Sequence, residues 1–250
     1  MDKEIFLNDF AIRSFRNIGD DDYITARMTY RAKLAPQFLW SGLQAIEKYL
    51  KCILLLNRIP AKDVKHNLTA ALKLTEGAPF ELGLRARSRE FIAHLDTYGR
   101  SRYLEYPFHL KPFAVEDLDM TVWHIRRYCQ VLHYSLTLSG GKKQPMLDLE
   151  MHKIKDSENH SPQKFVLVGG TLEKIIADKQ HPAREALIWQ NRFFGMKART
   201  RVKLDSHLHS TNSPLSLHPE MLDEVLKYIY LPQGAIKEYT KLYPSGHSKK

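Results

Sequence analysis

Apolar residues recur at helical spacing through the first half of the chain, most clearly in the stretch 36–57, PQFLWSGLQAIEKYLKCILLLN. The stripe steps by four, three, four and three positions, at Leu39, Leu43, Ile46, Leu50 and Ile53. This spacing puts all of them on one side of a helix with 3.6 residues per turn. Pro36 suits a first helical turn, where a missing N–H leaves no intrahelical bond unmade. We predict one long, buried helix here.

The stretch 114–141, AVEDLDMTVWHIRRYCQVLHYSLTLSGG, repeats the pattern. Its apolar positions are Leu118, Val122, Ile125, Cys129, Leu132 and Leu136. Gly140 and Gly141 then supply a stop signal, because glycine commonly follows the last turn of a helix. The pattern therefore predicts a second long helix that runs from about Ala114 to Leu136.

Weaker helical patterns occupy about 22–34, 66–74 and 80–98, and the proline pair at 107 and 112 interrupts the chain after them. Proline disfavours helix at and just before its own position, so we expect 100–111 to be an irregular connection. Antiparallel packing of these elements predicts a mainly α fold built on a four- to five-helix bundle over 1–140.

After the glycine pair the helical pattern of apolar residues is lost, and 155–163 is polar enough to be a loop. The stretch 169–195 predicts two short helices separated near His181 and Pro182, and a further helix starts at Pro219. We expect a mostly helical C-terminal region over 145–243, with a short β element, and a flexible tail over 244–250.

The β element is predicted from strict alternation over 197–209, KARTRVKLDSHLH. Its odd positions are polar and mostly charged: Lys197, Arg199, Arg201, Lys203, Asp205, His207 and His209. Alternation with a period of two is typical of a strand. One face would then carry four cations, at 197, 199, 201 and 203, spaced by about 6.6 Å, or twice the strand rise of about 3.3 Å. These four residues are the candidate nucleic-acid-binding set.

Charge and composition narrow the classes of partner. The 250 residues carry a formal charge of +10, which favours polyanions such as RNA or nucleotides. Cys52 and Cys129 lie on predicted apolar helix faces, so we expect buried, reduced thiols. Neither a metal site nor a cofactor is predicted, because CxxC spacing and a glycine-rich phosphate frame are both missing. No apolar run reaches the roughly 20 residues of a membrane span, and the N-terminal stretch lacks the pattern of a signal peptide, so we expect a cytoplasmic protein without a membrane partner.

The helical half resembles a known superfamily over about residues 20–137. The resemblance rests on the order of DDYITARMTYRAKL, SGLQAIEKYLKCILLLNRI, KHNLTAAL and FIAHLDTYGRSRYLEYP. These stretches are similar to the HEPN superfamily, whose members are compact helical bundles that commonly dimerise. Many members are metal-independent endoribonucleases of defence and toxin systems, and others bind nucleotides or protein partners without cutting RNA.

The nuclease members carry an arginine and, after it, a histidine, with four to six residues between them. The arginine can grip a phosphate, and the histidine can move the proton of an attacking 2′-hydroxyl. By position, the resemblance implies Arg102 with His109 as the first catalytic pair and Arg89 with His94 as the second. Tyr103 departs from the small polar residue that nucleases carry after the arginine.

Two hypotheses follow from these observations. The first is a HEPN-like protein that engages RNA or a nucleotide, with Arg102 and His109 at the site of a metal-independent endoribonuclease. Spacing alone does not select that pair, because Arg126 or Arg127 with His133, and Arg201 with His207, match it too. The second hypothesis is a non-catalytic homodimer whose C-terminal region binds a protein partner.

Overall fold

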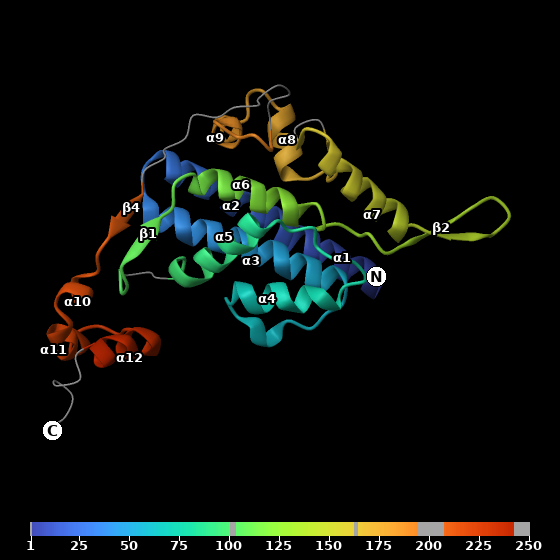
Figure 1. The fold of residues 1–250 in the computed structure, drawn as a ribbon. Coiled ribbons are helices and arrows are strands. Elements are labelled where there is room, and N and C mark those ends of the chain that lie inside the picture. The colour runs from blue at the N-terminus through green and yellow to red at the C-terminus, as the bar shows by residue number, and fades with distance from the viewer. Residues whose placement is uncertain (1, 101–103, 163–164, 195–207, 243–250) are drawn as a thin grey trace.

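The computed structural model describes residues 2–100, 104–162, 165–194 and 208–242, and it confirms a mainly helical protein (Figure 1). The bundle is built from α2 (Ile18–Arg31), α3 (Ala35–Leu56), α5 (Ala86–Tyr98) and α6 (Ala114–Arg126), with the shorter α4 (Leu68–Leu74) packed against α3 and α5. Short 3-10 turns follow at Lys62–Val64, Thr75–Gly77, Ser157–Asn159 and Pro219–Met221.

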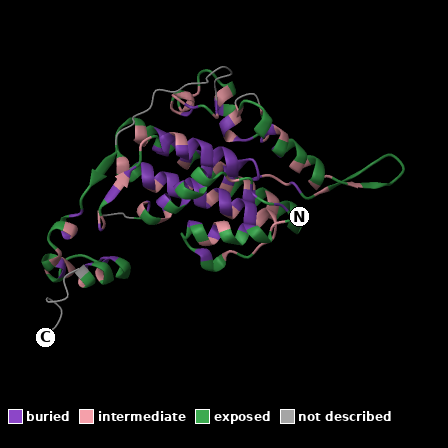
Figure 2. Cartoon of the chain, viewed as in Figure 1, coloured by how far each residue is buried: buried purple, intermediate pink, exposed green. Residues whose placement is uncertain are grey.

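Helix α3 is the central element of the bundle, because it packs against α2, α4, α5 and α6. Pro36 lies in its first turn, as predicted. Every member of the predicted stripe is buried: Leu39, Leu43, Ile46, Leu50 and Ile53. Figure 2 shows the buried residues concentrated in these central helices. The long helix predicted from the stretch 36–57 is therefore confirmed.

The shorter helices form close to their predicted places but begin elsewhere. Helix α4 starts at Leu68, because the Asn67 side chain accepts a hydrogen bond from the backbone N–H of Ala70 and so caps the helix. His66 lies outside the helix, and its Nδ1 is 2.9 Å from a carboxylate oxygen of Glu47.

The second long helix is shorter than predicted. Helix α6 ends at Arg126, and the next turns tighten through hydrogen bonds from Tyr128 N to Ile125 O and from Cys129 N to Arg126 O. The prediction that this helix runs to Leu136 is wrong. Its last residues form a hairpin of β2 (Ser135–Thr137) and β3 (Lys143–Pro145), in which Leu136 pairs with Gln144.

The hairpin explains why the two glycines do not end a helix. Gly140 and Gly141 have φ of 92° and 79°, a left-handed conformation that favours glycine in a tight turn. Cys129 and Leu132 are still buried in the bundle core. The apolar residues that continue the pattern past Arg126 are therefore spaced for burial in the core, although the chain is no longer helical there.

The connection 100–111 is not wholly irregular. Its described part contains β1 (Phe108–Leu110), which pairs antiparallel with β4 (His209–Thr211). Phe108 and Leu110 are buried, so hydrophobic burial stabilises a strand that the flanking prolines permit at an edge. The paired strands β1 and β4 lie between the helical bundle and the C-terminal part of the chain (Figure 1).

The remaining helices lie at the N-terminus and after the hairpin. The N-terminus forms α1 (Lys3–Phe10), which continues through a π-helix (Ala11–Asn17) into α2. After the hairpin come α7 (Leu147–Asp156), α8 (Thr171–Ala177) and α9 (Arg184–Ile188), of which α8 and α9 are the two predicted short helices. The C-terminal helices are α10 (Pro214–Leu217), α11 (Leu222–Leu226) and α12 (Gln233–Leu242). The helix predicted to start at Pro219 corresponds to the 3-10 turn at Pro219–Met221 and the short α11 that follows it.

The segment from α7 to α9 shares the core of the bundle. Ile154, Leu172, Ile175, Leu187 and Phe194 belong to the same buried cluster as the residues of α3. Buried polar groups reinforce the contact: the Arg126 guanidinium bonds both Asp20 oxygens, at 2.7 and 2.9 Å, and both Glu173 oxygens, at 2.7 and 2.8 Å.

The C-terminal helices have a small core of their own, made of Leu215, Leu222, Leu231, Ala235 and Tyr239. This cluster is tied to the loop before β1, because the Tyr239 hydroxyl donates to the carbonyl oxygen of Glu105 and its ring stacks on that of Tyr106. The predicted tail over 244–250 lies outside the described residues.

The two cysteines are as predicted: Cys52 and Cys129 are free thiols with no exposed surface. Burial raises the pKa of the Cys129 thiol well above its usual range, which keeps it protonated. Within the described ranges, no helix combines the length and the apolar character that crossing a membrane requires.

Candidate functional site

Several predicted site residues lie outside the described part of the chain. These are Arg102, the first-choice arginine, and the cationic set Lys197, Arg199, Arg201 and Lys203. The predicted strand over 197–209 overlaps the described residues only at its end, where His209 begins β4. The remaining candidates, His109, Arg89 and His94, all have described positions.

Arg89 and His94 do not converge. They lie five residues apart on α5, which rotates their side chains by about 140° around the helix axis. Arg89 is exposed, next to Glu76 and Glu81, whereas His94 is buried with 6% of its surface exposed. The second predicted pair is therefore not a unit within one chain.

The structure instead brings together the two candidate histidines. The ring centroids of His94 and His109 are 5.0 Å apart, with an angle of 68° between the planes. Tyr98 completes the group, because its ring centroid lies 4.8 Å from that of each histidine. We name these three residues the His94 cluster.

Local structure accounts for the cluster. His94 and Tyr98 are four residues apart on α5 and so share one helix face. His109 lies at the centre of β1, between the buried Phe108 and Leu110, so its side chain projects to the opposite side of the strand. Burial of Phe108 and Leu110 in the bundle core holds that strand against the helices.

His94 is held neutral. Burial, together with repulsion from the nearby His109 and Lys111, lowers its pKa from 6.5 to about 4. Within the described part of the chain, Nε2 of His94 is buried and has no hydrogen-bond partner. Such a nitrogen can accept a proton or a hydrogen bond from a group that enters the cluster.

Tyr98 also lines a cleft of about 510 Å³ between the end of α5 and the C-terminal helices. The charged lining residues are Asp96, Arg100, Glu105 and Glu238. Arg100 is paired with Asp96, and Asp96 also accepts a hydrogen bond from the backbone N–H of Leu68 at 2.9 Å. The described lining therefore has an excess of carboxylates, and the cleft gives little attraction to a phosphate.

Sequence reasoning missed Tyr98 as a site residue and did not pair the two histidines with each other. The first omission had a usable signal, since Tyr98 follows His94 by four residues in a helical pattern. The second had none, because the His94–His109 contact depends on where β1 lies. Among the described residues, no group of three or more histidine, cysteine or acidic side chains could hold a metal ion.

Comparison of the chain with models of known protein families gave no match. Searches among curated proteins and among solved structures likewise found no similar protein.

Proposed function

We propose that the protein is a HEPN-like, RNA- or nucleotide-interacting protein and a metal-independent endoribonuclease whose site includes the His94 cluster. The observation that carries this proposal is the contact between His94 and His109, two histidines selected separately from the sequence. The sequence resemblance and the charge of +10 support the choice of RNA as substrate.

The cluster has the groups that such a reaction uses. Cleavage at a ribose needs one group that takes the proton of the 2′-hydroxyl and one that protonates the leaving oxygen. Two imidazoles in contact can divide these roles, since His94 is neutral over the physiological range and can accept a proton. The Tyr98 hydroxyl is a further donor, and Arg102, by resemblance, would grip the phosphate.

The test is cleavage of a mixed-sequence, end-labelled RNA in the presence of EDTA. We expect wild-type protein to cut, and we expect His109→Ala and Arg102→Ala to lower the rate by roughly 100-fold or more, the usual contribution of a positioned acid or base. His152→Ala is the matched control, because His152 is an exposed histidine on α7.

Absence of cutting by folded wild-type protein would overturn the nuclease proposal. Cutting that stops on chelation would replace it with a metal-dependent reaction. If Arg89→Ala abolished cleavage as fully as Arg102→Ala, a site shared between two copies of the chain would be required, because Arg89 lies away from the His94 cluster.

A second candidate function, a non-catalytic dimeric interaction module, is favoured by exposed apolar side chains. At the N-terminus, Ile5, Phe6, Phe10 and Ile18 are each 44–65% exposed. After α11, Tyr228, Ile229 and Tyr230 are 51–78% exposed. Apolar groups gathered on a surface mark protein contacts.

The molecular mass in solution, measured by light scattering, tells which of the two exposed apolar regions forms the dimer contact. We expect a dimer mass that reverts to a monomer mass in Phe6→Ser/Phe10→Ser and stays unchanged in Tyr228→Ser/Tyr230→Ser. A dimer combined with intact, unbound RNA would favour this second function over the first.

A further inference from the structure

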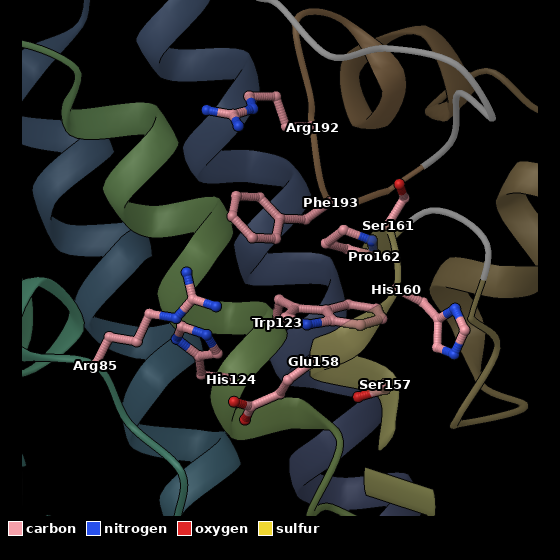
Figure 3. A pocket seen from close by; sticks show the side chains of 10 residues that line it. All are labelled: Arg85, Trp123, His124, Ser157, Glu158, His160, Ser161, Pro162, Arg192 and Phe193. Carbon is pink, nitrogen blue, oxygen red and sulfur yellow. The ribbon is translucent and has the colours of Figure 1, made fainter. Parts of the chain in front are cut away.

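The cavity drawn in Figure 3 offers little free surface to a ligand. It is about 250 Å³ in volume and lies between α5, α6 and the segment after α7. The Trp123 and His124 side chains that reach it from α6 are almost fully covered. Glu158 and Arg192 are held in ion pairs with neighbouring side chains, and Arg85 is exposed to solvent. The hairpin of β2 and β3, by contrast, presents apolar and charged groups that are free to meet a partner.

The β2–β3 hairpin projects from the body of the molecule (Figure 1). Its turn is closed by hydrogen bonds from Leu138 N to Lys142 O, at 2.8 Å, and from Gly141 N to Leu138 O, at 3.0 Å. Apart from the adjoining residues, no described atom lies within 4 Å of the position that a Cβ would take at Gly140 or Gly141. A two-stranded hairpin by itself is only marginally stable in water, so this one gains from a surface that covers it.

One face of the hairpin carries two uncovered leucines. Leu136 and Leu138 are two positions apart along the chain, so their side chains leave the strand on the same face. They are 46% and 45% exposed. The residue opposite Leu136 is the polar Gln144, which gives the leucine no apolar neighbour across the strands. Aliphatic side chains neither stack on bases nor bind phosphates, so the leucines favour an apolar phase over a nucleic acid.

Cations lie on both faces of the hairpin. Lys143 pairs with Thr137, so its side chain leaves on the face opposite the leucines. Lys142 comes one position earlier and therefore leaves on the leucine face. Neither lysine has an ion-pair partner among the described residues. The stretch 133–146 contains no aspartate or glutamate, so the whole hairpin attracts anions.

We propose that the β2–β3 hairpin binds the surface of an anionic membrane. Leu136 and Leu138 insert into the boundary between the headgroups and the acyl chains. Lys142 and Lys143 contact the lipid phosphates. A headgroup layer surrounds an inserted hairpin, so that cations on both faces meet anions, whereas a groove on a protein would cover one face. The formal charge of +10 adds attraction to an anionic surface.

This contact goes beyond the proposed function, because the hairpin contains no residue of the His94 cluster. The strands bond their backbone groups to each other, which lowers the cost of entering the boundary. The expectation of a protein without a membrane partner rested on the absence of an apolar run long enough to span a bilayer, and a surface contact needs no such run.

Sedimentation of the full chain with lipid vesicles tests the proposal. We expect binding to vesicles of equimolar phosphatidylserine and phosphatidylcholine, and much weaker binding to phosphatidylcholine alone. Lys142→Ala/Lys143→Ala should weaken the binding by roughly 30-fold, since each lysine near an anionic surface contributes about fivefold. Leu136→Ser/Leu138→Ser should weaken it by about 10-fold or more, through lost apolar burial.

Matched variants carry the same changes outside the hairpin. Leu149→Ser replaces a leucine of α7 that is 49% exposed. Lys62→Ala/Lys73→Ala removes two exposed lysines from the region of α4 and the turn before it. Both controls are expected to bind vesicles as the wild type does. All the hairpin positions are exposed, so every variant should keep the wild-type circular dichroism and thermal midpoint.

A second measurement reports insertion directly. Both native thiols, Cys52 and Cys129, are buried, so Ser139→Cys in the turn can be labelled selectively with a polarity-sensitive dye. Anionic vesicles are expected to shift the emission of this dye to the blue. The same dye on Ser14→Cys, an exposed position of the N-terminal π-helix, is expected to keep its emission.

Several results would overturn the proposal. These are folded wild-type protein that stays in solution with anionic vesicles, binding that depends on the lysines but not on the leucines, and a dye at position 139 that does not respond. Loss of RNA binding in Leu136→Ser/Leu138→Ser, with vesicle binding retained, would make the hairpin a nucleic-acid contact instead. His109→Ala is expected to bind vesicles as the wild type does, so the vesicle result is independent of the proposed nuclease.

Discussion

His94 should make the stability of the protein depend on pH. Its pKa is about 4 in the folded chain, because burial disfavours the charged imidazole, and 6.5 in an unfolded chain. Between these two values the unfolded state binds a proton that the folded state does not. The free energy of unfolding therefore falls as the pH is lowered from about 6.5 towards 4.

The size of the effect follows from the two pKa values. Between about pH 7.5 and pH 4.5, the contribution of His94 to the free energy of unfolding falls by about 2.5 kcal/mol, at 1.36 kcal/mol per pKa unit. His124, with the same shift, adds a similar loss. Asp117 acts in the opposite direction, since burial raises its pKa to about 6 and its contribution grows as the pH falls.

A variant isolates His94 from these other groups. His94→Gln removes the titrating imidazole but keeps a polar side chain, and it should destabilise the protein through lost packing. Because the wild type also loses the His94 contribution at low pH, the destabilisation by the substitution should be about 2.5 kcal/mol larger at about pH 7.5 than at about pH 4.5. The other titrating groups are common to both proteins and cancel in the difference.

Urea unfolding followed by circular dichroism at the two pH values measures this difference. His152 is exposed, so the free energy of unfolding of His152→Gln should differ from that of the wild type by the same amount at both pH values. If the gap between wild type and His94→Gln were also the same at both pH values, His94 would not be buried in neutral form, and the reasoning would be refuted.

Four further variants, one of them a control, test how the parts of the molecule are held together. Arg126→Met leaves the buried Asp20 carboxylate without its ion pair and should cost about 3–5 kcal/mol in urea unfolding; an effect below 1 kcal/mol would contradict the described network. Gly99→Ala should cost about 1–3 kcal/mol, because a Cβ there would lie 2.7 Å from the Leu95 carbonyl oxygen, whereas Gly169→Ala, with no atom within 4 Å, should be nearly neutral. Tyr239→Phe removes a hydrogen bond worth about 1 kcal/mol, so amide exchange in α10–α12 should quicken by about fivefold while exchange in α3 is unchanged.

The sequence predicted some residues of the candidate site but not the contacts between them. The family resemblance, together with Arg/His spacing, selected His94 and His109 but assigned them to different arginines, since both follow distance along the chain only. Arg89 is exposed on another face of α5 and does not meet His94 within one chain, because five residues along a helix turn the side chain by about 140°.

The sequence by itself determined the mainly helical class and the central helix α3, because a 3.6-residue apolar period and a first-turn proline act through neighbouring residues. Only the tertiary structure decided that α6 ends at Arg126, where the side chain is bound by Asp20 and Glu173 from distant helices. It also decided that Phe108 and Leu110 of β1 are buried in the bundle core, which brings His109 to His94. Such contacts join positions far apart in the chain, and burial and ion pairing select them only once the bundle has formed.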